Sequence, residues 1–370
     1  MAICCMMMRP IMTRLIALAL LAASPLAAAA QHLLYVAEPG IRNYEEYGGV
    51  GILVFDIDHH YKFVRRIPTW TVPAGQKPEN VKGIAASAKT GRVYVTSLNR
   101  MIAIDAVSGK RIWDKTYEGG CDRMAISPDG KLLYVPQFEG PMWTVVDGKT
   151  GSVITRVETK SGSHNTVYAN DGSRVYLAGL KSPLLSVVDP KTHKVTGTVG
   201  PFTNVIRPFT VNGANTLAFV NVNGLLGFEI GDIRTGKMLH RIEIQGYQQG
   251  PVKRHGCPSH GIALTPDEKE LWVVDGHNNA VHVFDNTVKP PRQTVSITLR
   301  DSPGWWSFSL DGKFGYSSTG EIVDVATKKI VAALKDETGR EVHSEKVLDL
   351  VVDRGKVIKA NNQFGVGQKK

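Results

Sequence analysis

A repeat of about 40 to 50 residues runs through this chain of 370 residues and constrains its fold more than any other feature. The clearest copy covers 123–157, where four short runs rich in Val, Ile and aromatic residues are separated by clusters of Gly, Pro and Asp. Such runs are typical of β-strands. The cluster Pro128-Asp129-Gly130 suits a tight turn, because Pro fixes φ, Asp bonds the backbone ahead and Gly accepts a positive φ. One copy therefore predicts a four-stranded antiparallel meander.

The third predicted strand of every copy ends in an aspartate. These aspartates are 39 to 53 residues apart, at Asp56, Asp105, Asp147, Asp189, Asp232, Asp285 and Asp324. Similar turns follow them, such as DGKTGS at 147–152 and DIRTGK at 232–237. A four-stranded unit that recurs every 40–45 residues or so indicates a β-propeller. Seven copies predict an all-β fold over 31–370, a single seven-bladed β-propeller of four-stranded antiparallel blades.

The first blade has no inner strand at its N-terminal end, because the chain enters the repeat at the predicted second strand, 32–37. The segment KVLDLVVD, 346–353, has a strand pattern and no partner of its own. We expect it to close the ring as the inner strand of the first blade, since closure removes exposed sheet edges. The last residues, 361–370, are expected to be loosely held.

The repeats resemble those of the YVTN-type, YncE-like family of seven-bladed bacterial propellers. The resemblance rests on GRVYVTS at 91–97, KLLYVPQ at 131–137 and the SPDGK and D-x-x-T-G-K turns, and it covers nearly the whole chain after residue 30. It implies the propeller fold. It leaves the function open, because members of this family and its relatives bind DNA, serve as subunits of redox enzymes, or catalyse lyase and lactonase reactions.

Residues 1–30 differ from the repeats. Arg9 and Arg14 precede an apolar run, 15–23, which is followed by small residues. This order is that of a secretory signal peptide, with cleavage expected near Ala30–Gln31. The apolar run is too short to span a bilayer as a helix. The sequence thus predicts a periplasmic or secreted protein, which we expect to be a monomer.

The formal charge is +10, or +8 without the two arginines of the N-terminal segment. A basic balance favours anionic partners, although it also serves solubility alone. The chain has no run of Lys and Arg with interleaved aromatic residues, so nucleic acid is a partner that only the charge and the resemblance support. An anionic small molecule or a partner protein is the other expectation.

The strand order places the long insertions 38–50, 69–81 and 245–259 on one face of the ring, which we call the top face. Long loops on a rigid scaffold are where binding usually occurs. Residues at the start of each inner strand should surround the central channel there, and we call them the mouth residues. Aligning the repeats gives Lys82, Asp122 with Arg123, His164, Arg207, His260, Trp305 with Trp306, and either His343 or Glu345.

Three of the mouth residues are cations, Lys82, Arg123 and Arg207. Around a concave mouth they would concentrate positive potential and attract an anion, unless each pairs with a local carboxylate, such as Arg123 with Asp122. The predicted ligand site therefore consists of these cations with His164, His260 and Trp305.

The histidines suggest a metal as an alternative. His164 and His260 hold equivalent positions in two blades, and the loop that leads to His260 carries His255 and Cys257. Imidazole and thiolate suit Zn or Cu, so these four residues are candidate ligands of a divalent transition metal. A metal-free polar pocket and an absence of function are the other interpretations.

Two further features remain open. Cys121 and Cys257 could form a disulfide in an oxidising compartment if the 245–259 loop folds across the mouth. The segment 103–113 resembles the tryptophan-docking motif of pyrroloquinoline-quinone dehydrogenases, but it occurs once. We therefore expect Trp113 to pack between blades and do not expect this quinone cofactor (PQQ).

Taken as a whole, the sequence favours an exported binding or scaffold protein that uses the mouth of the top face. The alternatives are a metal- or histidine-assisted enzyme of the lyase or lactonase type and a subunit of a periplasmic redox system. Turnover stays open and catalytic residues unassigned, because no acid–base pair at a recognisable spacing is visible and only Asp122 and Glu345 are carboxylates near the histidines.

Overall fold

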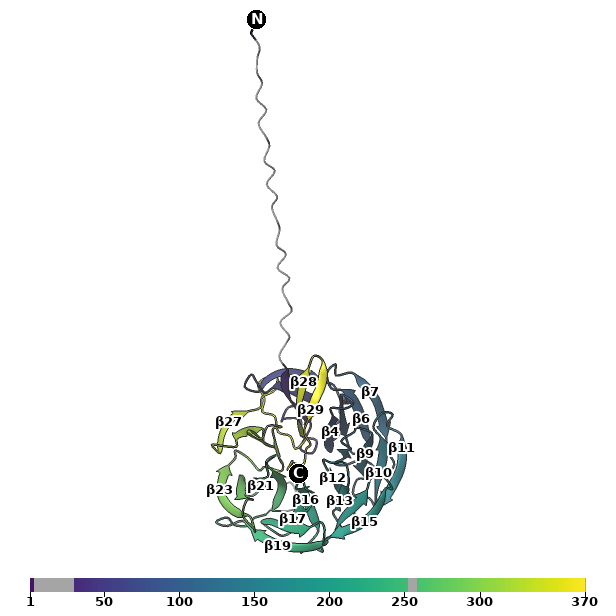
Figure 1. Cartoon of the computed structure of the whole chain (residues 1–370), viewed down its shortest axis with the longest axis vertical. Helices are drawn as coiled ribbons and strands as arrows, with labels where there is room; N and C mark the ends of the chain where they lie inside the picture. Colours follow the sequence, from purple (N-terminus) through teal and green to yellow (C-terminus); the bar gives the residue numbers. More distant parts are fainter. Residues whose placement is uncertain (3–29, 252–257, 370) are drawn as a thin grey trace.

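The computed structural model describes residues 1–2, 30–251 and 258–369. Within these ranges, 29 β-strands form seven antiparallel sheets and no helix is present. The sheets are arranged as blades around a central channel (Figure 1). This confirms the predicted all-β, seven-bladed propeller. The predicted signal peptide falls almost wholly outside the described residues, and in the described part no helix has the length and apolarity needed to cross a bilayer.

Six blades are sheets of four consecutive strands, which run in sequence order from the inner to the outer edge. The second and third blades are β4 Gly83–Ser87, β5 Arg92–Thr96, β6 Arg100–Asp105, β7 Arg111–Thr116, and β8 Ala125–Ile126, β9 Leu132–Pro136, β10 Met142–Asp147, β11 Val153–Glu158. The fourth and fifth are β12 Ser163–Tyr168, β13 Val175–Gly179, β14 Leu185–Asp189, β15 Lys194–Val199, and β16 Ile206–Val211, β17 Leu217–Val222, β18 Gly227–Asp232, β19 Lys237–Glu243. The sixth and seventh are β20 Ser259–Leu264, β21 Glu270–Asp275, β22 Ala280–Asp285, β23 Arg292–Thr298, and β24 Trp306–Phe308, β25 Phe314–Ser317, β26 Glu321–Asp324, β27 Lys329–Ala333.

The first blade joins the two ends of the chain. β28 Val347–Asp353 pairs with β1 Gln31–Glu38, which is followed by β2 Gly51–Asp56 and β3 Lys62–Ile67. The C-terminal segment therefore supplies the missing inner strand, as predicted. An unpredicted strand, β29 Lys356–Ala360, pairs with the other edge of β28, so this sheet has five strands.

The repeated aspartates fix the turns between third and fourth strands. Asp147 Oδ1 accepts hydrogen bonds from the backbone N–H groups of Lys149 at 2.9 Å and Thr150 at 2.7 Å. An Asp side chain that bonds the backbone ahead stabilises a tight turn. The fifth turn residue has a positive φ, 74° at Gly151 and 56° at His193, where the sequence lacks Gly. The recurring D-x-x-T-G-K pattern is thus a requirement of the turn.

The tyrosines of the YVTN-like motifs connect neighbouring blades. Tyr94 is fully buried, and its hydroxyl donates to the carbonyl of Gly148 in the next blade at 2.9 Å. Tyr35 donates likewise to Ala106 O at 2.9 Å. Trp113 packs in the apolar cluster between the second and third blades, as expected. These motif residues hold the fold together, and they carry no information about a ligand.

The C-terminal tail, 361–369, is held in the channel, so the expectation that it is loose is wrong. Gln363 Nε2 donates to Met124 O at 3.1 Å, and the Leu264 N–H donates to Gly365 O at 2.9 Å. Phe364 is only 2% exposed. Inner strands present unpaired backbone groups to the channel, and a tail of almost any sequence can pair with them. Its polar, glycine-containing composition therefore did not reveal its position.

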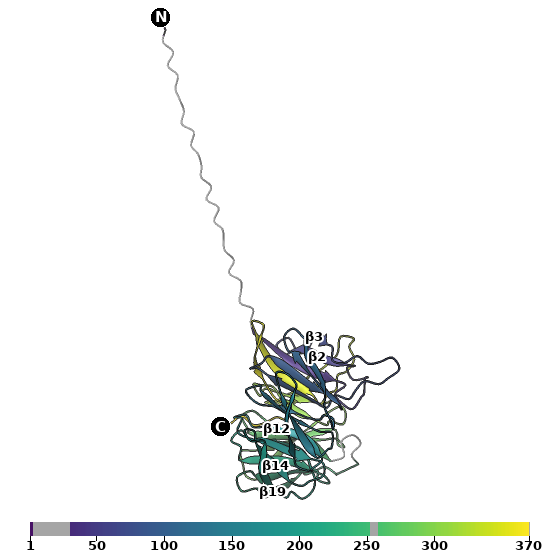
Figure 2. The same ribbon diagram turned by 90° about the vertical axis from the view of Figure 1, so that its right-hand side faces the viewer.

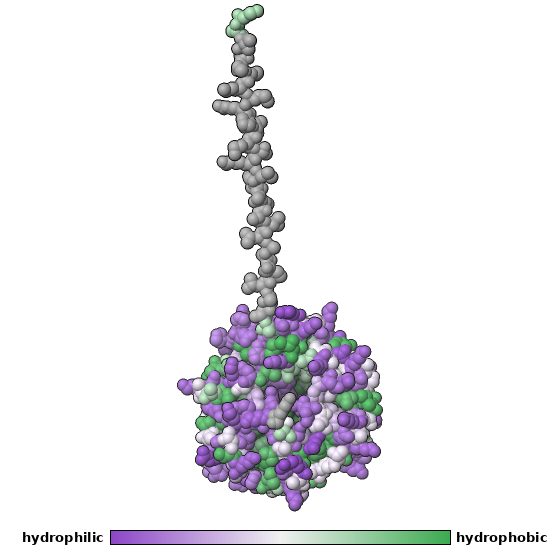
Figure 3. Space-filling view, viewed as in Figure 1, coloured by the Kyte–Doolittle hydropathy of each residue, from purple (hydrophilic) through white to green (hydrophobic). Residues whose placement is uncertain are grey.

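The chain end emerges at one face of the ring, opposite the side from which long loops project (Figure 2). That face is mainly hydrophilic and is hollowed near its centre (Figure 3). A cavity of about 260 Å³ adjoins the tail and is lined by the inner strands of the second, third and fourth blades. The tail thus occupies the channel at the face opposite the predicted mouth.

The position of the tail predicts a large effect of a single substitution. Phe364→Ala should lower the free energy of unfolding by about 3–5 kcal/mol, because the buried ring packs on Trp305 and truncation leaves a cavity. Urea unfolding measures this change. Ile358→Ala is the control, since Ile358 is 49% exposed on the adjacent strand and its loss should matter little. Equal stability of Phe364→Ala and the wild type would mean that the tail is held loosely after all.

Candidate functional site

The mouth residues stand at the same end of the seven inner strands, as the alignment predicted. Lys82 and Trp305 immediately precede inner strands, and Arg123 and Glu345 each lie two positions before the start of one. His164, Arg207 and His260 are each the second residue of an inner strand. Two of the predicted positions belong elsewhere. Trp306 is fully buried and stacks on Trp272, with ring centroids 5.0 Å apart, so it is part of the core. His343 stacks on Tyr47 of the 38–50 loop.

Asp122 organises one side of the mouth. It is fully buried, its Oδ2 accepts the Nδ1–H of His164 at 2.5 Å, and its Oδ1 lies 3.7 Å from Lys82 Nζ. Burial acts to raise the pKa of Asp122, but the hydrogen bond from His164 and the charges of Lys82 and Arg123 outweigh it and hold the pKa below its usual value. Burial lowers the pKa of His164. At neutral pH the imidazole is therefore neutral, with its proton on Nδ1 and its Nε2 able to accept one.

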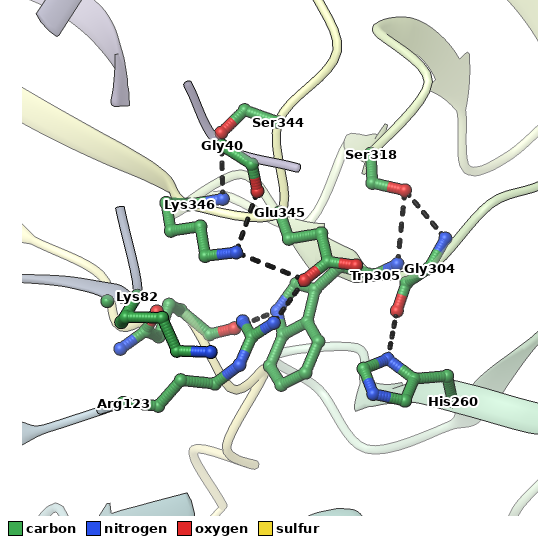
Figure 4. A network of polar contacts seen from close by, with 12 residues as sticks. Gly40, Lys82, Arg123, His260, Gly304, Trp305, Ser318, Ser344, Glu345 and Lys346 are labelled. Atoms are coloured by element: carbon green, nitrogen blue, oxygen red, sulfur yellow. Dashed lines mark hydrogen bonds and ion pairs between the residues drawn. The ribbon is translucent and has the colours of Figure 1, made fainter. Parts of the chain in front are cut away.

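Glu345 organises the other side, where Arg123, Lys346 and Trp305 meet (Figure 4). Glu345 Oε2 accepts from Arg123 Nη2 and lies 3.1 Å from Lys346 Nζ. The Arg123 guanidinium stacks on the Trp305 indole, with Cζ 3.7 Å from the ring centroid. Trp305 Nε1 in turn donates to the carbonyl of Gln363 in the tail. The tail therefore supports the indole on which Arg123 rests.

The predicted cations Lys82 and Arg123 are thus each close to a carboxylate. Lys82 is close to Asp122, while Arg123 pairs with Glu345 and not with its sequence neighbour Asp122. The guanidinium can still donate a hydrogen bond, because Arg123 Nη1 is buried and has no hydrogen-bond partner within the described residues. The same holds for both amide atoms of Asn165, whose backbone forms a bridge with Arg123.

Sequence reasoning missed Asn165 and Lys346. Lys346 is 4% exposed, and its Nζ donates to Gly40 O at 2.7 Å. Burial lowers its pKa to about 7, with Glu345 opposing this shift and Arg123 and Lys82 adding to it. The signal was a lysine at the start of an otherwise apolar inner strand, because lysine is almost never fully buried without a partner.

The predicted metal ligands are only partly covered by the structure. His260 is 6% exposed, and its Nδ1 donates to Gly304 O at 2.6 Å, so both candidate histidines have Nδ1 in a hydrogen bond. His255 and Cys257 lie outside the described residues. Among 30–251 and 258–369, no three His, Cys, Asp or Glu side chains group to hold a metal ion. A metal site that includes His255 or Cys257 remains a prediction.

Cys121, the other half of the possible disulfide, is fully buried and forms no disulfide within the described residues. Its possible partner Cys257 lies outside them, so the disulfide stays a prediction. As a thiol, Cys121 has a pKa that burial raises, so it would be protonated at neutral pH. A buried, protonated thiol is chemically inert. Cys121 therefore belongs to the core beneath the mouth.

The buried amine of Lys346 predicts a pH-dependent stability. Its pKa is about 7 in the folded chain and roughly 10.4 when unfolded. Between these values the unfolded chain binds more protons, so this lysine's contribution to stability rises with pH and its full penalty applies below about pH 7. Relative to Lys346→Met, the wild type should gain up to about 1.4 kcal/mol of unfolding free energy per pH unit in that window.

Urea unfolding at several pH values measures this difference. Lys131→Met is the matched control, because the Lys131 side chain is 79% exposed and should show no such trend. A stability difference between wild type and Lys346→Met that is constant from neutral to alkaline pH would contradict a lowered pKa of Lys346.

Comparison with known proteins supports the fold and does not identify a family or a function. No protein-family model matches the chain, and no curated protein matches it in sequence. Among solved structures, the chain is similar to the hydrazine synthase of Kuenenia stuttgartiensis, with a TM-score of 0.58 and 14% identity, over 79% of this chain and 99% of that chain. At this identity the similarity supports a propeller-like fold alone.

Proposed function

We propose that this protein is an exported binding or scaffold propeller, of the YVTN-type, YncE-like kind, which binds an anionic ligand at the mouth of its top face. The repeat motifs support the family, and the order of residues 1–30 supports export to the periplasm or beyond. The seven-bladed scaffold supports a binding role, because it brings residues from seven blades to one mouth.

The main observation in favour of an anionic ligand is the buried N–H group of Arg123 Nη1, which has no hydrogen-bond partner within the described residues. Nη2, by contrast, is held by Glu345. Arg123 is only 4% exposed, so this N–H group lies away from bulk water. In such a desolvated place a charged donor favours an acceptor with negative charge.

The neighbouring amide narrows the class of ligand. Asn165 is 1% exposed, and its Nδ2 is a second buried donor without a partner in the described part of the chain. Arg123 and Asn165 lie side by side in the backbone. A carboxylate or phosphate group has enough acceptor atoms to accept from both residues. The proposed ligand is therefore a small carboxylate or phosphate compound.

Titration calorimetry with citrate, oxalate, inorganic phosphate and pyrophosphate tests this proposal. At least one anion should bind, and Arg123→Gln should weaken its binding about tenfold or more, because a charged donor is lost from a desolvated site. Lys131→Gln removes the same charge from an exposed turn and should leave affinity unchanged. Absence of binding across the panel, or equal affinity of Arg123→Gln, would contradict the proposal. A DNA duplex titrated in parallel tests nucleic acid, whose binding must weaken steeply with salt.

A second candidate function, a histidine-assisted enzyme of the lyase or lactonase type, is favoured by the Asp122–His164 pair. A general base needs an oriented imidazole that is neutral at the working pH. The Asp122 carboxylate accepts the Nδ1–H of His164, and burial keeps the pKa of His164 low. A redox role rests on the family resemblance alone.

Hydrolysis of a panel of lactones tests this second candidate. If the chain is such an enzyme, His164→Ala should lower the rate about a hundredfold or more, the range typical of a lost general base. His240→Ala is the control, because His240 is an exposed histidine on β19. Elemental analysis of the protein purified without a histidine tag shows whether a metal takes part. No hydrolysis by the wild type, or equal rates in the His164 variant, would exclude this role.

A further inference from the structure

A cavity of about 150 Å³ lies between the first and second blades, and none of the mouth residues lines it. Its walls come from Glu38 at the end of β1, from the 69–79 segment and from Arg100 at the start of β6. The 69–81 insertion was expected to contribute to binding, but none of its residues belongs to the anion-binding site proposed at the mouth. This cavity therefore needs an explanation of its own.

Four side chains of the lining have a buried polar atom without a hydrogen-bond partner within the described residues. These atoms are Glu38 Oε1, Thr69 Oγ1, Trp70 Nε1 and Arg100 Nε. Leaving a buried polar group unpaired is costly, so each of these atoms calls for a partner outside the protein chain, either ordered water or a bound molecule or ion. Four such atoms around one cavity are consistent with a ligand that has several hydrogen-bonding atoms.

The unpaired atoms include both an acceptor and donors. Glu38 is fully buried; its Oε2 accepts the Gly40 N–H at 2.6 Å, which leaves Oε1 as an acceptor. Burial raises the pKa of Glu38, so an ammonium group beside it would restore the ionised form. Trp70 Nε1 and Arg100 Nε are donors. A ligand that satisfies all of them must donate in one part and accept in another.

The charge of the walls argues against a ligand with a net charge. The charged lining residues are two acids and two bases, Glu38, Lys77, Glu79 and Arg100. Arg100 Nη2 already pairs with Glu79 Oε1 at 2.7 Å. A net anion would leave Glu38 Oε1 without a donor, and a net cation would face Arg100. Separate positive and negative groups on one small molecule avoid both conflicts.

The size and the remaining surface narrow the ligand further. A cavity of about 150 Å³ admits a molecule the size of benzene. Val50, Trp70 and Pro78 add apolar surface, while exposed Gln76 and Lys77 line the side that faces solvent. The space thus suits a molecule with a short apolar side chain that enters through the 69–81 loop.

We propose that this cavity binds a small zwitterion, a free α-amino acid with a short apolar side chain. Its ammonium group would bond Glu38 Oε1, and its carboxylate would accept from Trp70 Nε1 and Arg100 Nε. The apolar side chain would lie against the indole and the prolines. This site is separate from the anion-binding site proposed at the mouth, so an experiment can contradict one proposal without affecting the other.

Titration calorimetry with alanine, valine and proline tests the proposal on the intact wild-type protein. At least one of them should bind. For valine, the amine without the carboxylate (isobutylamine) and the acid without the amine (isovaleric acid) should each bind about tenfold more weakly or worse, because each leaves buried groups unpaired. No binding at millimolar concentration, or an amine or acid that binds as well as the amino acid, would overturn the proposal.

Variants locate the site. Trp70→Phe removes the indole N–H donor from the cavity wall and should weaken binding about tenfold. Glu38→Gln removes the carboxylate that would bond the ammonium group and should weaken binding to a similar extent. Trp113→Phe is the matched control, since Trp113 is also 9% exposed with a buried, unpaired Nε1 but does not line the cavity. Arg123→Gln at the mouth should have no effect. Unchanged affinity in a folded Trp70→Phe or Glu38→Gln would overturn the site, and if either variant fails to fold, the analogue series on the wild type decides.

Discussion

The antiparallel pairing of β28 with β1 is the contact on which the rest of this molecule depends. Residues 347–352 pair with 31–36, so the two ends of the chain share one blade. In a propeller each blade packs only on its neighbours, and without this pairing the first and last blades would each expose a face and an edge. A closed ring gives the seven inner strands a common channel, and only then do residues from distant repeats face one another.

The segment that closes the ring also builds the mouth. Glu345 and Lys346 precede β28 directly, and the chain continues through β29 into the tail that supports Trp305. Arg123 thereby lies between the Glu345 carboxylate and the Trp305 indole, and the indole is itself held by Gln363 of the tail. Fold closure and the position of the charged side chains at the mouth are therefore consequences of the same interactions.

Buried ion pairs at the mouth are better suited to holding side chains in place than to stabilising the fold. Removing two charges from water costs free energy that their attraction only partly returns. Asp122 and Glu345 nevertheless hold His164, Lys82 and Arg123 in defined positions. The residues that generate the family resemblance, by contrast, serve turns and blade packing, as Asp147 and Tyr94 show. This is why the family resemblance predicts the fold but gives no information about a ligand.

The sequence by itself determined the number of blades, the strand order, the closing segment and the end of the channel at which most of the mouth residues lie, Trp306 and His343 excepted. It could do so because turn chemistry and strand alternation are local and recur with the repeat. Only the tertiary structure decided which groups meet. Arg123 pairs with Glu345, 222 residues away, rather than with adjacent Asp122. The tail enters the channel by backbone hydrogen bonds, which almost any sequence can make. The width of the channel and the direction of each side chain select such partners, and repeat spacing encodes neither.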